Sequence, residues 1–474
     1  MKIQQIYTGC LAQGAYYIES EGEAAIIDPL REVQPYIDMA EKNGTRIKYV
    51  FETHFHADFV SGHKDLAEKT AAQIVYGPTE IETGFECLKA SDGMVFNIGK
   101  IQLKLLHTPG HTLESSCYLL TDEEGIDKAI FTGDTLFIGD VGRPDLAQKL
   151  VKDLTQDMLA GMLYDSLRNK IMPLSDDIIV YPAHGAGSAC GKNMSKETSD
   201  TLGHQKLTNY ALQTEMTKDE FIKELTSGLI APPSYFPKNV MLNIQGYDRI
   251  DEVMERGARS LSAETFQLIA QETSALILDT RKPQRFNKGF IPGSINIGID
   301  GNFAVWVGTL IPDIQQEILI VAEPEREKEV VMRLARVGYD HAIGYLEGGM
   351  ESWINHNYPI DQIHSISAEE LHAIKNENPD INILDVRKKS EYDSEHILDA
   401  QNAPLDFINE SMESIDKNKT YYVHCAGGYR SMVFCSILKA RGYDNLIEIN
   451  GGFQAIQKTA KFQLTEYVCP TTLL

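Results

Sequence analysis

The sequence predicts an α/β protein built from about three domains, and three observations support this. First, 474 residues, at roughly 150 residues per domain, are enough for several hydrophobic cores. Second, short apolar strands alternate with helical stretches over residues 1–190, and third, the rest of the chain contains a repeat of domain length. Hydrophobic residues make up 43% and charged residues 24% of the chain, which excludes a collagen-like, low-complexity or largely disordered protein.

The predicted strands of the first 190 residues are β-branched or aromatic and are bounded by Gly, Pro, Asp or Ser. They lie at residues 24–28, 47–51, 101–107, 128–132 and 178–181. Helices are expected at 31–42 and 61–72. This alternation predicts layered sheets covered by helices. Residues 194–258 are mostly polar, and we expect them to contain helices that complete the domain.

A repeat occupies the remaining chain. LILDTRKPQRFNKGFIPGSINI begins at Leu276, and NILDVRKKSEYDSEHILDAQNAP begins at Asn382. Asp279 matches Asp385, an Arg follows two residues later in both copies, and each copy later contains a GYD turn and a Gly-Gly pair. The period of 106 residues (385 − 279) is a domain length and is too long for a solenoid. We therefore expect two small α/β domains joined near Tyr358–Pro359.

Charge and cysteine content restrict the partners and the compartment. The net charge is −24, and no run of basic residues offers a site for nucleic acid or anionic lipid, so neither partner is expected. The N-terminus has no apolar run of signal-peptide length, and no apolar stretch is long enough to span a bilayer. The seven cysteines are widely and irregularly spaced, unlike a disulfide framework, so a reducing cytoplasm is the expected location.

Histidines and aspartates follow four successive predicted strands of the first domain. They are His54, His56, Asp58, His111, Asp134 and His184. The first three form the THFHADF segment, in which alternate residues of an extended loop turn toward one side. Imidazoles and carboxylates delivered by four strand ends predict a metal site. Four unrelated capping or core polar residues are the alternative.

This pattern resembles the metallo-β-lactamase fold, an αββα sandwich with its metal at one edge, over about residues 1–250. The two-metal motif of that family has His where this chain has Phe59. Because phenylalanine cannot bind a metal, we expect a single metal ion. The closer resemblance is to the persulfide dioxygenase branch, which implies one Fe(II) per chain on His54, His111 and Asp134. The residues expected to orient ligands or bound water are then His56, Asp58 and His184.

Two imidazoles and one carboxylate leave about three positions open on octahedral iron, enough for dioxygen and a sulfur substrate. The ligand set would also accept Zn or Mn, so the choice of iron rests on the resemblance. Members of this branch usually have His at the position of Phe59, and Asp after the PAH histidine, where this chain has Gly185.

A cysteine follows another predicted strand, in YYVHCAGGYRS. Glycines let the loop after Cys425 curl so that backbone N–H groups point at the sulfur. The following helix N-terminus and Arg430 add positive charge that would stabilise an anionic persulfide. The rest of the expected cradle is Ala426, Gly427, Gly428, Tyr429 and Ser431. A buried structural cysteine is the alternative.

This segment resembles the rhodanese active-site loop, and the repeat resembles two tandem rhodanese domains, expected at 259–358 and 363–474. The corresponding stretch of the first domain, LIVAEPEREKE, contains no Cys, so this domain is interpreted as degenerate. Asp385 and Arg387 lie on the framework of that family and are expected to be structural.

Cys190, in PAHGAGSACGKN, follows His184 by six residues. Because it lies close in sequence to the predicted metal edge, Cys190 is a candidate catalytic residue that relays sulfur. A small residue packed in a tight turn is the alternative.

The order of domains resembles the persulfide dioxygenase–rhodanese fusion proteins of bacterial sulfide detoxification. The resemblance implies that dioxygen oxidises a low-molecular-weight thiol persulfide, of glutathione, coenzyme A or bacillithiol, to sulfite. Cys425 would transfer sulfane sulfur to or from thiosulfate. One alternative is a zinc thioester hydrolase of the glyoxalase II kind with rhodanese appendages, and another is a non-enzymatic sulfur carrier or sensor. The sequence selects neither the carrier thiol nor the oligomeric state, and a homo-oligomer stays open.

Overall fold

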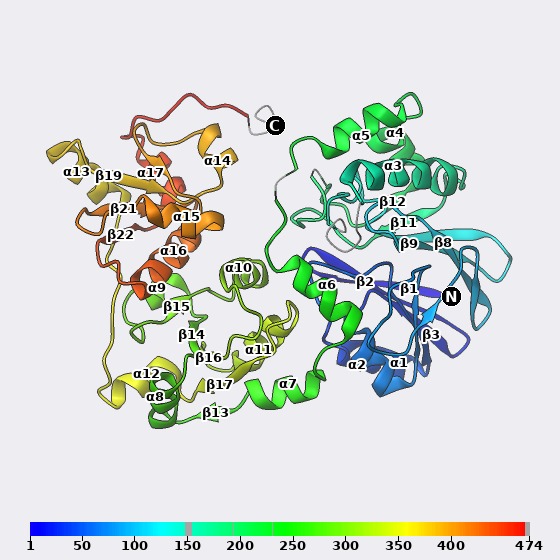
Figure 1. Cartoon of the computed structure of the whole chain (residues 1–474), viewed down its shortest axis with the longest axis horizontal. Helices are drawn as coiled ribbons and strands as arrows, with labels where there is room; N and C mark the ends of the chain where they lie inside the picture. The colour runs from blue at the N-terminus through cyan, green and yellow to red at the C-terminus, as the bar shows by residue number, and fades with distance from the viewer. Residues whose placement is uncertain (147–153, 193, 230, 470–474) are drawn as a thin grey trace. The chain divides into compact units, whose positions relative to one another are not determined.

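The structure is a computed structural model (Figure 1). It describes residues 1–146, 154–192, 194–229 and 231–469. The chain forms two compact units: Met1–Glu252 with Leu334–Tyr339, and Val253–Arg333 with the chain from Asp340 onward. None of the helices in these described ranges is long and apolar enough to cross a lipid bilayer.

The described part of the first unit contains two six-stranded sheets. In spatial order, the first sheet consists of β1 (Lys2–Thr8), β2 (Gln13–Ser20), β3 (Glu23–Ile27), β4 (Arg46–Phe51), β5 (Gln73–Tyr76) and β6 (Leu88–Lys89). The second consists of β12 (Asp200–Thr201), β11 (Ile179–Pro182), β10 (Asp127–Gly133), β9 (Ser116–Thr121), β8 (Ile101–His107) and β7 (Val95–Ile98). The first sheet is antiparallel up to β3 and parallel beyond it. In the second, only β10 and β11 pair in parallel.

Apolar side chains fill the space between these sheets, where Tyr16 and Phe51 of the first sheet share one buried cluster with Leu103 and Phe131 of the second. The helices of this region are α1 (Gln34–Asn43), α2 (His63–Thr70), α3 (Gln156–Ser166), η1 (Leu167–Ile171), α4 (Leu202–Thr208), η2 (Tyr210–Leu212), α5 (Lys218–Thr226), α6 (Phe236–Gln245) and α7 (Ile250–Gly257). Helices α1 and α2 pack on the outer face of the first sheet, and α3 and α5 pack on that of the second (Figure 1). The result is the predicted αββα sandwich.

The five predicted strands coincide with β3, β4, β8, β10 and β11 to within one residue at each end, which confirms them. The two predicted helices are shorter than expected. Helix α1 begins only at Gln34, with a proline in its first turn, a position that proline favours. Helix α2 ends at Thr70 because Ala71 adopts a left-handed conformation with φ of 55°.

The second unit contains two five-stranded parallel sheets with the same strand order in its described residues. The first copy orders its strands as β13 (Ser260–Leu261), β17 (Ala342–Leu346), β16 (Ile318–Val321), β14 (Leu276–Asp279) and β15 (Ile295–Asn296). The second copy orders them as β18 (Ser365–Ile366), β22 (Leu446–Ile449), β21 (Tyr421–His424), β19 (Asn382–Asp385) and β20 (Gln401–Asn402). The matching order confirms the repeat.

Short helices connect these strands (Figure 1). Those of the first copy are α8 (Ala263–Glu272), α9 (Pro283–Phe286), α10 (Phe303–Leu310), α11 (Glu327–Ala335) and α12 (Gly349–Asn355). Those of the second copy are α13 (Ala368–Glu377), α14 (Lys389–Ser394), η3 (Leu405–Phe407), α15 (Ile408–Glu413), α16 (Tyr429–Ala440) and α17 (Gly452–Thr459).

Both copies contain the same buried ion pair at the end of a central strand. Arg281 lies 2.6 Å from Asp279, and Arg387 lies 2.5 Å from Asp385. Each guanidinium also donates to the backbone carbonyl of the residue that lies eight positions after its own arginine. Because the pair is present with and without a neighbouring cysteine, it belongs to the framework of the fold.

Candidate metal centre and thiol cradle

Three buried side chains converge at one edge of the sandwich. His54 follows β4, His111 follows β8 and Asp134 follows β10, and their potential ligand atoms all lie within 4.8 Å of one another. The Nε2 atoms of His54 and His111 lie 4.0 Å and 3.4 Å from Oδ2 of Asp134. The structure thus brings together the three residues that the sequence resemblance selected as metal ligands.

Hydrogen bonds on the far side of both imidazoles leave Nε2 free to bind a metal. His111 Nδ1 lies 2.8 Å from the carbonyl oxygen of Arg143, which can only accept, so Nδ1 carries the proton. The Thr53 hydroxyl donates to Asp28 over 2.9 Å and therefore accepts from His54 Nδ1 at 3.0 Å. A hydrogen-bond partner at Nδ1 keeps the proton on that nitrogen, and this is the tautomer that metal binding through Nε2 requires.

Asp134, the third member of the group, is also suited to bind a cation. Neither carboxylate oxygen of Asp134 has a hydrogen-bond partner among the described residues, although its side chain is buried. Burial, with the neighbouring His56 and His111, holds the pKa of His54 well below its usual value, so this imidazole is neutral. A buried carboxylate without a hydrogen-bond partner, beside the neutral imidazole of His54, is costly without a positive charge, and a metal ion would supply that charge.

A second buried group adjoins the first. His184 Nε2 lies 3.4 Å from Asp58 and 3.6 Å from Asp134. Cys190 forms a further potential ligand group with Asp134 and His184. Burial, followed by the carboxylates of Asp58 and Asp134, raises the pKa of the Cys190 thiol well above its usual value. The sequence placed Cys190 near the metal edge, but its approach to Asp134 depends on loop packing that no local pattern reports.

His56 lies deeper, between two carboxylates. Its Nε2 is 3.1 Å from Asp28 and 3.2 Å from Glu52. Burial alone would lower the pKa of His56, but these carboxylates raise it well above its usual value. Burial also raises the pKa of Glu52 to about 7. Sequence reasoning singled out neither acid, although each follows a strand, β3 or β4, and strand-end position was the available signal.

The chain departs from the family pattern at Phe59 and Gly185, and the structure shows which side chains occupy the space at both positions. The Phe59 ring is fully buried and packs on His56 with ring centroids 4.3 Å apart. A Cβ atom at Gly185 would lie 2.8 Å from the Tyr7 hydroxyl, so an aspartate there would require that hydroxyl to move. An aromatic ring and a tyrosine therefore occupy space that polar side chains would need.

Arg143 connects the loops of the two groups. Its carbonyl accepts from His111, and its N–H donates to the carbonyl of Cys190 over 3.0 Å. Its guanidinium donates to both oxygens of Asp145 at 2.7 Å and to the Ala189 carbonyl at 3.2 Å. Arg143 therefore positions the candidate ligand His111 relative to Cys190.

A small pocket opens beside His111. Its lining residues are Phe55, Ala57, His111, Thr112, Glu114, Leu146 and Val240. Of these described lining residues, Glu114 alone is an acid, and it accepts from the Phe55 N–H over 2.9 Å. The lining is otherwise mostly apolar.

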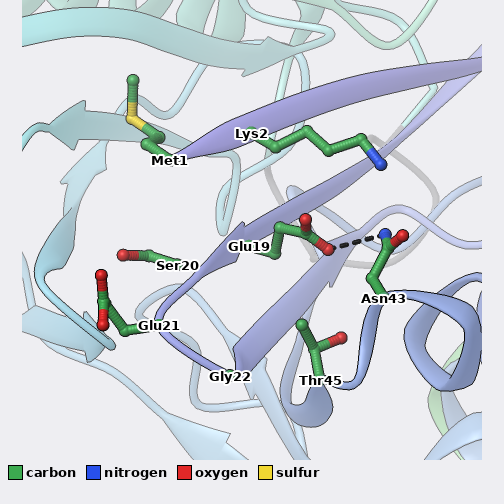
Figure 2. A pocket seen from close by; sticks show the side chains of 8 residues that line it. All are labelled: Met1, Lys2, Glu19, Ser20, Glu21, Gly22, Asn43 and Thr45. Carbon is green, nitrogen blue, oxygen red and sulfur yellow. Dashed lines mark hydrogen bonds between the residues drawn. The ribbon is translucent and has the colours of Figure 1, made fainter.

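Another hollow, shown in Figure 2, lies at the opposite ends of β2 and β3 from the metal group. Its lining residues are Met1, Lys2, Glu19, Ser20, Glu21, Gly22, Asn43 and Thr45. Asn43 donates to Glu19 over 2.8 Å across it. The hollow has no imidazole or thiol in its lining, so it adds nothing to the candidate chemistry.

The sequence predicts a thiol cradle in the loop after Cys425, and the structure shows which atoms of that loop contact the sulfur. Cys425 follows β21, and the Gly428 N–H donates to its Sγ over 3.1 Å. Gly428 has φ of 98°, a conformation that glycine adopts without strain. The Ser431 hydroxyl, in the first turn of α16, lies 3.6 Å from the same sulfur. The side chain of Cys425 is almost fully buried.

Two expected cradle residues have other partners. The Arg430 guanidinium donates to Glu391 of α14 at 2.5 Å and 2.8 Å, so its charge is shared with that carboxylate. The Tyr429 hydroxyl donates to the carbonyl of Gly298 in the first copy over 2.7 Å. The described contacts of the sulfur are therefore the Gly428 N–H and the Ser431 hydroxyl.

Comparisons with known proteins agree with this architecture. Residues 8–184 match the Metallo-beta-lactamase superfamily, and residues 262–356 and 367–459 match the Rhodanese-like domain. A crystal structure of a metallo-beta-lactamase from Staphylococcus aureus subsp. aureus COL is 33% identical, with a TM-score of 0.64, and the match covers 73% of this chain and 98% of that one. The chain belongs to the metallo-β-lactamase superfamily, and two rhodanese-like domains follow its metallo-β-lactamase domain.

Individual relatives differ in their named activity. A hydroxyacylglutathione hydrolase from Francisella tularensis subsp. novicida is 33% identical over 169 residues, which are 36% of this chain and 61% of that protein. This chain spans 56–61% of the length of the curated relatives that it matches. The crystal structure of ETHE1 from Myxococcus xanthus is 27% identical with a TM-score of 0.43, and the match covers 51% of this chain and 98% of that one.

Proposed function

We propose that the metallo-β-lactamase domain is a persulfide dioxygenase with one Fe(II) per chain, and that the second rhodanese copy is a thiosulfate sulfurtransferase. The observation that carries the proposal is the presence, in one chain, of a buried group of two histidines and one carboxylate and of a cysteine whose sulfur accepts a backbone N–H. Phe59, packed on His56 where the family has a further ligand, favours a single metal. Sulfide detoxification in the cytoplasm is the proposed role.

At the metal edge, Fe(II) held by His54, His111 and Asp134 would supply open coordination positions for dioxygen and the terminal sulfur of a persulfide. The chain's own groups keep this set in order. The Arg143 carbonyl and Thr53 hold the two imidazoles with Nε2 available. The mostly apolar pocket beside His111 admits the sulfur and limits the approach of water.

In the second rhodanese copy, the Cys425 thiolate attacks the sulfane sulfur of thiosulfate. A Cys–S–S bond forms, the S–S bond of thiosulfate breaks, and sulfite leaves with the electron pair. The Gly428 N–H and the N-terminus of α16 stabilise the persulfide anion that results. A thiolate of glutathione, coenzyme A or bacillithiol then takes the outer sulfur and becomes the persulfide substrate. The same steps in reverse join sulfur to sulfite.

Oxygen uptake tests the dioxygenase. Protein loaded with iron without air receives glutathione persulfide or coenzyme A persulfide, and His111→Ala and Cys425→Ser variants run in parallel. We expect rapid uptake that His111→Ala abolishes and Cys425→Ser retains. Absence of uptake from the wild-type protein with both persulfides contradicts the proposal.

Cys190 has a separate test. As a relay, it would receive sulfur beside Asp134 and His184, with which it is grouped. A Cys190→Ser variant is then expected to change the ratio of sulfite to thiosulfate produced. An unchanged ratio and an unchanged rate remove this role.

A zinc thioester hydrolase is the second candidate, because Asp134, His184 and Cys190 form another potential ligand group and the curated relatives include hydroxyacylglutathione hydrolases. Zinc-loaded protein and a hydroxyacylglutathione thioester test this candidate. Hydrolysis that is independent of oxygen and is lost with Asp58→Ala or His184→Ala would support it over the dioxygenase.

A further inference from the structure

A buried glutamate lies beneath the thiol cradle. Glu448 is in β22, a strand next to β21, and is only 2% exposed. Its Oε1 lies 3.0 Å from the Ser431 hydroxyl, and the same hydroxyl lies 3.6 Å from Cys425 Sγ. One side chain thus joins a buried carboxyl group to the reactive sulfur. The proposed function assigns no role to this carboxyl group.

The geometry allows two arrangements, because Ser431 has a single hydroxyl proton. When Glu448 is ionised, Ser431 donates to the carboxylate and turns a lone pair toward Cys425. When Glu448 is protonated, it donates to Ser431, and Ser431 donates to the sulfur. The Gly428 N–H donates to the sulfur in both arrangements. Only the second adds a hydrogen bond from Ser431, so the proton on Glu448 decides whether Ser431 donates to the sulfur.

The surroundings of Glu448 contain no basic partner. Among the described residues, no Lys, Arg or His forms an ion pair with it. The Cys435 thiol of α16 faces it, Ser365 faces it from β18, and Ser431 joins it to the Cys425 thiol. Burial raises the pKa of Glu448 to about 7, although its bonds to Ser431 and Ser365 act in the opposite direction. A proton is therefore available on this group near neutral pH.

The first copy provides an internal comparison. Ala322 of that copy corresponds to Cys425 of the second copy. Each directly follows the strand residue that pairs with the aspartate of its own copy, Asp279 or Asp385. The strand registers place Tyr345 at the position of Glu448, because Ile320 pairs with Tyr345 as Val423 pairs with Glu448. Six residues after Ala322 stands the exposed Lys328, where the second copy has Ser431. The cysteine, serine and glutamate are therefore all missing from the copy that lacks the thiol.

We propose that Glu448 is a positioning residue that takes the proton of Cys425 through Ser431 when the sulfur becomes anionic, and so holds Ser431 as a donor to the persulfide. The inference rests on the proposed sulfurtransferase function. In the loading step, Cys425–SH, ionised Glu448 and thiosulfate become the Cys425 persulfide anion, protonated Glu448 and sulfite. The thiol proton passes to Ser431 while the Ser431 proton passes to Glu448, so no proton enters or leaves.

The test is the pH profile of Cys425 loading in the full-length protein, followed as sulfite released from thiosulfate in a single turnover. The variants are Glu448→Gln, Ser431→Ala and the control Glu347→Gln, which removes an exposed carboxyl group from the end of β17 in the first copy. Wild type and the control are expected to give a bell-shaped profile. Its acid limb arises because protonated Glu448 cannot take the thiol proton. Its alkaline limb arises because Cys425 and Glu448 are then both ionised, so Ser431 donates to the carboxylate and no longer to the sulfur.

Glu448→Gln keeps a permanent donor to Ser431, so we expect it to lose the alkaline limb and to load on the order of tenfold faster than wild type above pH 8. Ser431→Ala is expected to lose the limb as well, with loading on the order of tenfold slower at the optimum. A Glu448→Gln profile of wild-type shape, shifted only in height, overturns the proposal and leaves Glu448 a structural residue.

Alkylation of Cys425 by iodoacetamide, followed by mass spectrometry across the same pH range, separates failure of the inference from failure of the proposed function. If no variant releases sulfite, the sulfurtransferase proposal fails, and alkylation then decides about Glu448. A lower midpoint of the alkylation profile in Glu448→Gln than in wild type and Glu347→Gln supports the coupling to Cys425. Identical midpoints overturn it.

Discussion

The two rhodanese-like copies have the same sheet and the same Asp–Arg pair, yet they differ at one loop. In the second copy, the loop after β21 presents Cys425 and the Gly428 N–H. In the first, the matching loop begins with Ala322. The comparison shows that the buried pair is common to both copies and that the cysteine loop is not. The fold is therefore associated with the pair, whereas the proposed sulfur chemistry is associated with the loop of the second copy alone.

The two loops differ in charge as well as in the presence of a nucleophile. The first copy has Glu323, Glu325 and Glu327 in the five residues that begin after Ala322. Glu325 has φ of 68°, so it adopts the left-handed conformation that Gly428 adopts in the second copy. Negative side chains there oppose an anionic persulfide, so a cysteine alone would not make this loop reactive.

The largest expected effect concerns the nucleophile. Cys425→Ser is expected to reduce sulfite release from thiosulfate by a factor of at least about 10³, because the sulfur that forms the new bond is gone. Adding Ala322→Cys to that variant is expected to restore nothing, since the first loop is acidic. Sulfite release in a single turnover measures both variants. Recovery of sulfur transfer by Ala322→Cys would show that the two loops are equivalent and would contradict the inferred difference between the copies.

The next effect concerns the shared framework. Asp279→Ala and Asp385→Ala each leave a buried arginine without its partner, and each is expected to destabilise its own copy by about 3–5 kcal/mol. Hydrogen exchange of β14 and β19, combined with denaturant unfolding, measures the two copies separately. Similar losses in both copies support a purely structural pair. A loss below about 1 kcal/mol in the first copy alone would tie the pair to the cysteine.

The stability of the second copy is expected to depend on pH through Glu448, whereas the first copy has no carboxyl group at this position. The folded-state pKa is raised from 4.5 to about 7, so this group's contribution to stability is full below pH 4.5 and is lost as pH rises through 7. Glu448→Gln is therefore expected to be neutral near pH 4.5 and to gain about 3 kcal/mol relative to wild type above pH 7. Unfolding of the second copy at both pH values measures this. An equal effect at the two pH values contradicts it.

The smallest effect concerns the contact between the copies. Tyr429→Phe removes the bond to the Gly298 carbonyl, and we expect a loss of about 1 kcal/mol of stability. Hydrogen exchange near Gly298 should increase in this variant. Unchanged exchange there would mean that Tyr429 does not join the copies in solution.

Local patterns predicted the strands and the repeat. Apolar strands such as 101–107 are recognisable from their own residues, and the repeat indicates two similar domains directly. Strand ends drew attention to a set of histidines and aspartates, whereas the choice of His54, His111 and Asp134 as ligands came from the family resemblance and stays a prediction. The glycine-rich loop after Cys425 likewise specifies its own backbone conformation.

Partners brought together by tertiary packing could not be predicted. Glu448 lies in LIEINGG, which reads as a half-buried strand, and nothing local indicates that its carboxyl group reaches Ser431. The same holds for Arg430, whose partner Glu391 is supplied by a separate helix. Cys190 needed the loop around Arg143 to bring it to Asp134 and His184. Such contacts depend on how distant segments pack.

The most direct measurement of the central claim follows labelled sulfane sulfur through both centres. Iron-loaded protein receives glutathione, dioxygen and thiosulfate that carries a radiolabel on its outer sulfur. We expect labelled sulfite from the wild-type protein, and none from Cys425→Ser or His111→Ala, while Cys425→Ser still oxidises added glutathione persulfide. Labelled sulfite that persists in either variant, or its absence from the wild-type protein, would contradict the account of one chain that transfers sulfur and then oxidises it.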